Sequence, residues 1–375
     1  TLGPTIGGYL IDDYSWPYIF YVNIPVGIAA TVLTLMYIKN PPYMTGNRTP
    51  ASQVDWLGIG LLIAGVGSLQ LVLEQGERED WFSSPFITTF ALVAAIGVVG
   101  FIWRELTAKL PIVDLRVLKN RNLAVGTLFS FILGFGLFAS VFIVPVFVQS
   151  ILGFTALQTG LMLIPGAIAT GFMMPIVGTM IQKGISQKYM IAVGFVIFFL
   201  FTYWVYTIIT PQAGQSDFFY PLLLRGVGLG LLFVPVTTFS LSTLRGKEIA
   251  AGAGLTAMVR QLGGSFGVAI VSSFIASKAF IHRSDLLRNI SIYDLSVQDR
   301  LKSLQQGFMQ NSGDAVKSQD QAYKALDLMI TKQSYILTYM DTFLILGIFF
   351  LLCIPLVFLI RKSAAGNKVD LSAVH

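Results

Sequence analysis

Nine long runs of apolar residues follow one another along this chain, and they constrain its fold more than any other feature. Each run is close to or above the roughly 20 residues that a helix needs to cross a bilayer, and the charged residues fall mainly between the runs. Charged residues make up 12% of the chain, whereas soluble domains carry about 25%. The runs cover residues 18–38, 56–73, 86–103, 123–152, 157–181, 189–209, 218–244, 249–277 and 335–360. We therefore predict an all-α polytopic membrane protein.

The first residues of the chain read as the second half of a further membrane helix. The apolar stretch before Asp12 has about 11 residues, roughly 16 Å of helix, against roughly 30 Å of hydrocarbon. It contains Gly3, Pro4, Gly7 and Gly8, and glycines spaced four apart allow the backbones of two membrane helices to approach closely. We expect this stretch to be a partial span and the chain to be truncated at its N-terminus.

The basic residues indicate how the spans are oriented. Lysines and arginines concentrate in alternate connections, for example 104–121, 183–188 and 245–247, whereas the connection 74–80 is mostly acidic. Positive connections remain in the cytoplasm, so we expect the C-terminus to be cytoplasmic. The net charge of +6 is then a topology signal and does not indicate a nucleic-acid partner.

Two segments between the runs have patterns of their own. Residues 110–122 mix apolar and basic residues, as in a short interfacial helix at the inner surface, although an ordinary linker fits as well. Residues 279–333 form a long outside loop whose apolar residues recur at helical spacing. These residues are Val297, Leu301, Leu304, Phe308, Ala322, Ala325, Leu326 and Met329. We predict a helical hairpin there, either docking a partner or capping the ends of the spans.

Three charged residues fall inside the runs and are candidates for function. Arg260 is about midway along its run, Arg225 lies nearer the outer end, and Asp341 is the one acid well inside a run. A charge at the bilayer centre costs at least roughly 2.5–3.5 kcal/mol, so such residues face a partner or a wet cavity. The arginines would form structural ion pairs or gate the substrate path, and Asp341 would carry protons or pair with an arginine.

Signatures of enzymes and ATPases are missing from the sequence. The two histidines, His282 and His375, belong to no cluster with metal-ligand spacing, and Cys353 lies in an apolar run. The glycines at 226–230 are followed by no Gly-Lys-Ser/Thr. We expect no metal and no cofactor, and any transport would draw on an ion gradient or a partner.

Several motifs, in their order, resemble a known family. Residues 3–8 are similar to the end of the antiporter motif of major facilitator drug exporters, and 16–27 resemble the entry of the sixth span in fourteen-span EmrB/QacA-type drug:proton antiporters. Asp-Trp-Leu-Gly at 55–58 and Pro-Ile-Val-Asp-Leu at 111–115 match as well. Further matches are 74–76 with 80–81, Arg225 with the glycines to 230, and 260–265.

The resemblance implies the major facilitator fold, with two six-helix halves and two extra spans between them. The first half would end with residues 1–38, and the extra spans 56–73 and 86–103 would lie within 39–109. The inner helix would cover 110–122. The second half would cover 123–361 and the cytoplasmic tail 362–375. The long loop at 279–333 is similar to that of Gram-negative EmrB-type members, which work with a periplasmic adaptor and an outer-membrane channel. The location implied is the bacterial inner membrane.

The function implied is proton-coupled export of hydrophobic or amphipathic compounds by alternating access. The binding site would lie near the bilayer midplane, lined by adaptable apolar and amide side chains. The candidates are Gln70, Phe129, Phe138, Phe142, Gln149, Met162, Met173 and Phe233, each of which could instead pack in the core or face lipid. The alternatives are a facilitator that imports or that exports a lipid or siderophore-like substrate, a membrane-embedded enzyme, and a non-transporting fragment that binds an adaptor.

Overall fold

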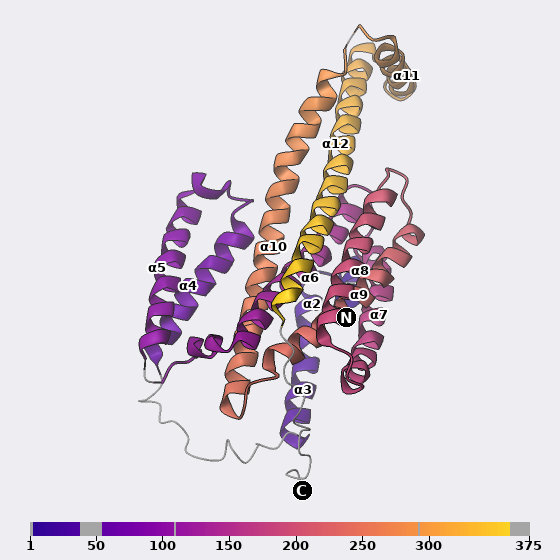
Figure 1. Ribbon diagram of the computed structural model, residues 1–375. Coiled ribbons are helices and arrows are strands. Elements are labelled where there is room, and N and C mark those ends of the chain that lie inside the picture. The colour runs from indigo at the N-terminus through magenta and orange to yellow at the C-terminus, as the bar shows by residue number, and fades with distance from the viewer. Residues whose placement is uncertain (1–2, 38–54, 109, 292, 361–375) are drawn as a thin grey trace.

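The computed structural model of the protein describes residues 3–37, 55–108, 110–291 and 293–360. Within these ranges the regular structure is helical throughout, without a β-strand. Nine helices in the described part of the chain are long and apolar enough to cross a membrane (Figure 1). The predicted fold class is therefore confirmed.

Within the described ranges most helices follow one another with short connections. The α-helices are α1 (Gly3–Asp13), α2 (Tyr18–Tyr21), α3 (Asn23–Tyr37), α4 (Trp56–Gln75), α5 (Pro85–Thr107), α6 (Arg121–Ser150), α7 (Ala156–Gln182), α8 (Gln187–Ile208), α9 (Phe219–Leu241), α10 (Lys247–Arg288), α11 (Leu295–Ser312) and α12 (Ala315–Cys353). Four short 3-10 helices join them: η3 (Trp81–Ser83), η4 (Leu115–Lys119), η5 (Gln215–Phe218) and η6 (Ile354–Leu359). Helices α6 to α10 and α12 form the main bundle, and α4 and α5 stand beside α10 as a separate pair (Figure 1).

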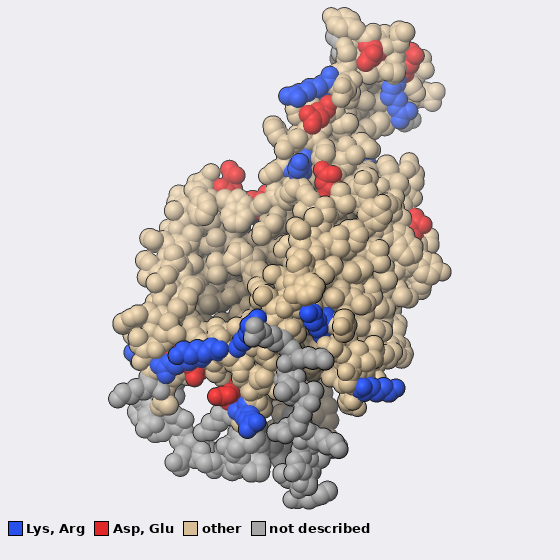
Figure 2. Space-filling view, in the orientation of Figure 1, with Lys and Arg blue, Asp and Glu red and all other residues tan. Residues whose placement is uncertain are grey.

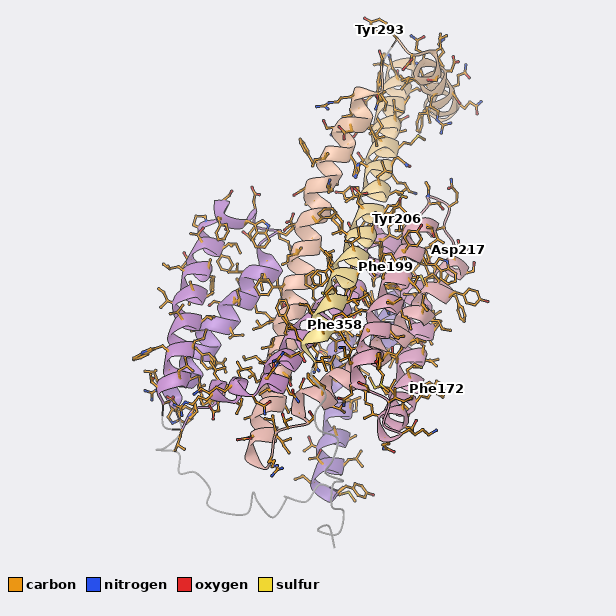
Figure 3. The ribbon with its side chains drawn as sticks, viewed as in Figure 1. Phe172, Phe199, Tyr206, Asp217, Tyr293 and Phe358 are labelled. Carbon is orange, nitrogen blue, oxygen red and sulfur yellow. The ribbon has the colours of Figure 1, made fainter. Side chains whose placement is uncertain are left out.

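The surface of the bundle is apolar along its length and charged towards its ends. Large apolar side chains are exposed on the flanks, among them Phe172 at 70% and Phe358 at 74% (Figure 3). Figure 2 shows most of the charges near the two ends and on the extension that carries α11. An apolar belt of this kind is the surface that a bilayer covers. We call the end that carries α11 the extended end, and the opposite end, where Arg104, Arg116 and Arg121 lie, the basic end.

Glycines bring the helices of the bundle into backbone contact. A Cβ added to Gly263 of α10 would overlap the carbonyl oxygen of Phe131 in α6, and one added to Gly267 would lie 2.6 Å from that of Phe135. Gly226 of α9 lies just as close to Gly166 of α7. Close approach of this kind maximises van der Waals contact, which replaces the hydrophobic effect between helices inside lipid.

The core is built from aromatic rings of α6, α8 and α12. The ring centroids of Phe198 and Phe350 are 4.3 Å apart, and Phe195 lies 5.8 Å from Phe350 and 5.9 Å from Phe129. All four side chains are fully buried. Phe129, predicted to line a substrate pocket, therefore belongs to this core.

The helical hairpin predicted in the outside segment 279–333 is present as α11 and the start of α12, but the two adjoining spans are longer than predicted. Helix α10 continues to Arg288 and α12 already begins at Ala315, so both spans extend beyond the apolar belt as unbroken helices (Figure 1). A turn at Gly313, with a φ of 65°, joins α11 to α12. The two helices pack against each other. The boundaries were placed where apolar character ends, but polar residues with good helix propensity let a helix propagate past that point.

The interfacial helix predicted at 110–122 is also corrected. Only the five residues of η4 are helical before α6 begins at Arg121. The Asp114 side chain accepts a hydrogen bond from the Arg116 amide at 3.1 Å, and that of Asn120 accepts one from the Asn122 amide at 3.0 Å. Two capping residues so close together start two separate short elements in place of one helix.

Candidate functional site

Helix α1 meets the bundle at the start of α7. A Cβ on Gly8 would overlap the carbonyl oxygen of Ala156, whereas nothing lies within 4 Å of a Cβ on Gly3 or Gly7. The Thr5 hydroxyl donates to the Gly160 carbonyl oxygen at 2.9 Å. Of the glycines expected to make a tight contact, Gly8 makes it among the described residues and Gly3 and Gly7 do not.

Asp12 strengthens the same contact by capping α7 from another helix. Its carboxylate accepts a hydrogen bond from the Leu157 backbone amide at 2.8 Å. Thr155 and Gln158 already form a capping box at this N-terminus, so Asp12 satisfies a further orphan amide and adds a favourable charge–dipole interaction. This contact could not be predicted from the sequence, because Asp12 looked like an ordinary end of a span.

Arg225 is buried, and its partner is a carbonyl group. The side chain of this α9 residue is 6% exposed, donates to the Ser140 carbonyl oxygen at 3.4 Å, and lies 6.0 Å from the centroid of the Phe201 ring. No carboxylate of the described residues forms an ion pair with it. The expected structural ion pair is therefore not formed there. Pro145 of α6 has no amide hydrogen to donate to the Val141 carbonyl oxygen, one residue beyond Ser140.

Arg260 rests on an aromatic ring. Its guanidinium carbon lies 4.9 Å from the centroid of Phe233 in α9, and the arginine is half-buried. No ion pair with a described residue accompanies this contact. A cation over a ring face is stabilised without a carboxylate, which again replaces the ion pair that was expected.

The remaining pocket candidates are dispersed over the molecule. Met162 is 3% exposed in the core, and Phe142 packs half-buried against the same core. Phe138 faces Gly264 of α10, and Met173 faces Gly230 of α9. Of the eight candidates, Phe138 and Phe233 thus both lie against α10. They contact Gly264 and Arg260, which are one helical turn apart.

The two glutamines lie apart from that region. The Gln70 amide donates to Glu74 on its own helix at 2.7 Å, and Gln149 is exposed near the end of α6. A side chain that bonds one turn along its own helix satisfies itself locally and does not bridge helices. Neither glutamine joins the aromatic groups near Arg260.

Asp341 pairs with a histidine. Its carboxylate lies 2.9 Å from His282 Nε2, and the Asp341 side chain is 37% exposed. The pair joins α10 to α12 near the extended end, and Arg283 and Asp327 make a second link at 2.6 Å. Sequence reasoning missed this pair because it placed His282 in a loop; the unbroken α10 helix brings it beside α12.

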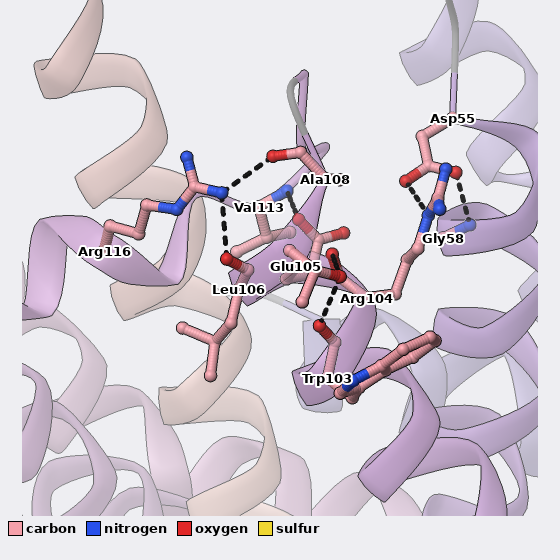
Figure 4. A network of polar contacts seen from close by, with 10 residues as sticks. Asp55, Gly58, Trp103, Arg104, Glu105, Leu106, Ala108, Val113 and Arg116 are labelled. Carbon is pink, nitrogen blue, oxygen red and sulfur yellow. Dashed lines mark hydrogen bonds and ion pairs between the residues drawn. The ribbon is translucent and has the colours of Figure 1, made fainter.

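At the basic end, a polar network ties the α4–α5 pair to the start of the bundle (Figure 4). Asp55 caps α4 at Gly58 and accepts a hydrogen bond from Arg104 Nε at 2.8 Å. The Arg104 guanidinium lowers the pKa of the Asp55 carboxyl. The stability that this pair contributes is therefore complete above the ordinary pKa of an aspartate and is lost as pH falls through the lowered value.

The same network reaches the connection to α6. Glu105, fully buried, accepts a hydrogen bond from the Val113 amide at 3.2 Å. Arg116 donates to the carbonyl oxygens of Leu106 at 2.9 Å and Ala108 at 2.7 Å, which satisfies the C-terminal end of α5. Among the described residues, no group of three or more His, Cys, Asp or Glu side chains could hold a metal ion.

Comparison with known proteins places the chain among membrane transporters. Residues 1–268 match the Major Facilitator Superfamily. The chain is 32% identical over 362 residues to the fatty acid resistance protein FarB of Neisseria gonorrhoeae, covering 96% of this chain and 68% of FarB. It is 29% identical over 355 residues to the multidrug export protein EmrB of Escherichia coli K12, covering 95% and 67%. The colistin resistance protein EmrB of Acinetobacter baumannii is 26% identical over 308 residues, covering 81% and 58%.

The contact between α1 and α7 gives a matched pair of substitutions. Gly8→Leu should push α1 away from Ala156, since overpacking of a tight contact costs about 1–3 kcal/mol, whereas Gly7→Leu should leave the contact intact. Disulfide formation between Asp12→Cys and Leu157→Cys, in a Cys353→Ala background, reports the distance. We expect slow cross-linking in the Gly8 variant only; equal rates in both variants would show that Gly8 is not the point of closest approach.

Proposed function

Because this chain belongs to the Major Facilitator Superfamily, we propose that it acts as a secondary active exporter that exchanges hydrophobic or amphipathic compounds for protons. The observation that carries the proposal is the similarity along nearly the whole chain to proteins named for multidrug export and for fatty acid resistance. The half-buried aromatic groups near Arg260 support it, since adaptable apolar surfaces accept varied ligands. Substrate would bind near the midplane and move by alternating access.

We place the protein in a bacterial inner membrane with the basic end in the cytoplasm. Arg104, Arg116 and Arg121 lie at that end, and the connection between α4 and α5 at the other end carries Glu77, Glu79 and Asp80. This distribution follows the positive-inside rule. The C-terminus would then be cytoplasmic and the extension with α11 periplasmic.

Asp341 and His282 are the groups that we assign to proton coupling within this chain. They are joined at 2.9 Å between the two helices that extend past the membrane. The contact between the two side chains depends on the placement of α10 against α12, so a shift of either helix would separate Asp341 from His282. Alternation between these two states would link proton movement to substrate movement.

The extension is proposed as a docking site for a periplasmic adaptor, which would lead to an outer-membrane channel. It carries exposed apolar side chains outside the apolar belt, among them Phe280 at 75%, Leu295 at 75% and Leu328 at 69%. Such side chains in water mark interaction surfaces. The extension has no part in binding the substrate in this proposal.

A lipid-like substrate is the second candidate, favoured by the name of the gonococcal relative. Hydrophobic compounds and fatty acids would share the same apolar site, so the two proposals differ in substrate and agree in mechanism. Efflux of a dye and of a fatty acid from the same vesicles separates them.

The orientation predicts the accessibility of two exposed glutamines, Gln182 at the end of α7 and Gln212 after α8. In a Cys353→Ala background, an impermeant thiol reagent added to intact spheroplasts should label Gln212→Cys and spare Gln182→Cys. Gln182 precedes α8 and Gln212 follows it, so the two side chains lie at opposite ends of that helix. Labelling of Gln182→Cys alone would reverse the orientation.

Proton coupling is tested with Asp341→Asn in energised vesicles. The substitution keeps the size of the side chain but removes its titration, so we expect efflux driven by a pH gradient to fall at least about tenfold while drug binding persists. Asp327→Asn is the matched control, because it breaks the other link between α10 and α12. Wild-type efflux in Asp341→Asn would remove Asp341 from the coupling mechanism.

Docking is tested with the double variant Phe280→Ser and Leu328→Ser. Loss of apolar contact area should lower drug resistance in cells, where the partner is needed, while exchange in vesicles stays at the wild-type rate. Lys324→Ser, a polar and exposed position of the same extension, should change neither. If the double variant lost vesicle exchange with normal folding, the extension would act in transport itself.

A further inference from the structure

An apolar slot opens on the side of the bundle, away from the contact of α1 with α7. Its volume is about 230 Å³. It is lined by Phe135 of α6, by Ile270, Val271 and Phe274 of α10, and by Thr342, Ile345, Leu346 and Phe349 of α12. The one hydroxyl of this lining, that of Thr342, donates to the Thr338 carbonyl oxygen at 2.6 Å. The slot therefore presents only hydrocarbon to its occupant.

The α10 edge of the slot lies beside the point where the α4–α5 pair is attached to the bundle. Ile270 lies one turn from Ser273 on the same face of α10, and Ser273 contacts the α4–α5 connection: it donates to Glu77 at 2.8 Å and accepts from Trp81 Nε1 at 3.1 Å. Figure 2 shows the surface hollowed between that pair and α10. Since Trp81 follows the end of α4, the slot begins at the level of the membrane surface and runs inward.

A lysine stands at the end of the slot nearest that surface. Lys278 lies one turn beyond Phe274 on α10, with its Nζ 5.8 Å from the centroid of the Phe274 ring. It forms no ion pair with a described residue, and the nearby Asp341 carboxylate is taken by His282. Glu77 is likewise bonded, to Ser273 and Trp81. Among the described residues beside the slot, Lys278 is thus the cation available to pair with an anionic ligand.

We propose that this slot binds a single-chain fatty acid from the bilayer, with its hydrocarbon chain between Phe135, Phe274 and Phe349 and its carboxylate at Lys278. The lining excludes a polar ligand, because nothing in it can repay the lost hydration. One slot holds one chain, and the single unpaired cation that the described residues place beside it, Lys278, balances one negative charge. The occupant is therefore a fatty acid, whereas a two-chain phospholipid would leave a chain outside. The site is separate from the exporter's proposed central site, and its occupancy does not depend on transport.

Photolabelling tests the proposal directly. The full-length protein in phosphatidylcholine nanodiscs is exposed to a palmitic acid that carries a diazirine, with and without excess palmitate. We expect saturable labelling of the peptides around 270–274 and 345–349. Ile345→Trp should abolish it by filling the mouth, and Ile348→Trp should not, since Ile348 is similarly exposed on the same helix but lies outside the slot.

The role of Lys278 has its own readout, which does not depend on whether the tryptophan variant folds. Lys278→Gln should weaken palmitate binding about fivefold, because one lysine near a membrane surface contributes about 1 kcal/mol towards an anion. Binding of methyl palmitate should not change. Lys188→Gln is the control, because Lys188 also lies over a ring, that of Phe358, at 4.4 Å, and this ring does not line the slot, whereas the Phe274 ring beside Lys278 does.

Four results would overturn the proposal. They are unchanged labelling in Ile345→Trp, equal affinity of the wild type for palmitate and its methyl ester, labels confined to α4 and α5, and displacement of the label by added phosphatidylglycerol. Labels confined to α4 and α5 would mean that the α4–α5 pair itself closes the slot. Displacement by phosphatidylglycerol would mean that the slot holds a phospholipid.

Discussion

A backbone amide inside a bilayer has no water to bond with, and the rest of this structure depends on that constraint. It makes every crossing segment a helix whose hydrogen bonds are internal. Once helices are fixed, only their spacing is free, and glycines such as Gly263 and Gly226 set that spacing by letting one backbone touch the next. Proline has no amide hydrogen, so each proline inside a helix leaves one backbone carbonyl group without its helical partner.

Backbone carbonyl groups also form contacts between helices. The Ser140 carbonyl oxygen of α6 accepts a hydrogen bond from Arg225 of α9. The Thr170 hydroxyl donates to the carbonyl oxygens of Gly166 and Gly226, which links α7 to α9. A buried guanidinium is expensive in a membrane, so a carbonyl and an aromatic face have to take the place of water around it. Arg225 therefore links α9 to α6 without a carboxylate from the described residues.

The sequence was a good guide to the spans and a poor one to the contacts between them. Hydropathy located all nine spans, because burial in lipid is a property of each segment alone. It placed the end of α10 too early and the start of α12 too late, since a helix that leaves the membrane loses its apolar signal but not its hydrogen bonds. That error hid the partner of Asp341, because a histidine in a loop cannot be placed and one on a helix can. Likewise, the spacing of the glycines pointed to Gly3 and Gly7, whereas Gly8 is the one that contacts α7.

The motifs at 55–58 and 111–115 are far apart in the sequence and form one joint in space. Asp55 of the first holds Arg104, and the next residue, Glu105, binds the amide of Val113 in the second (Figure 4). At the extended end, Trp81 and Glu77 fix the same helix pair to Ser273. The α4–α5 pair is thus attached to the bundle at both ends, and between these attachments its helices need not touch α10 closely. A slot open to lipid can persist there because the polar contacts, and not apolar packing along the helices, keep the pair in place.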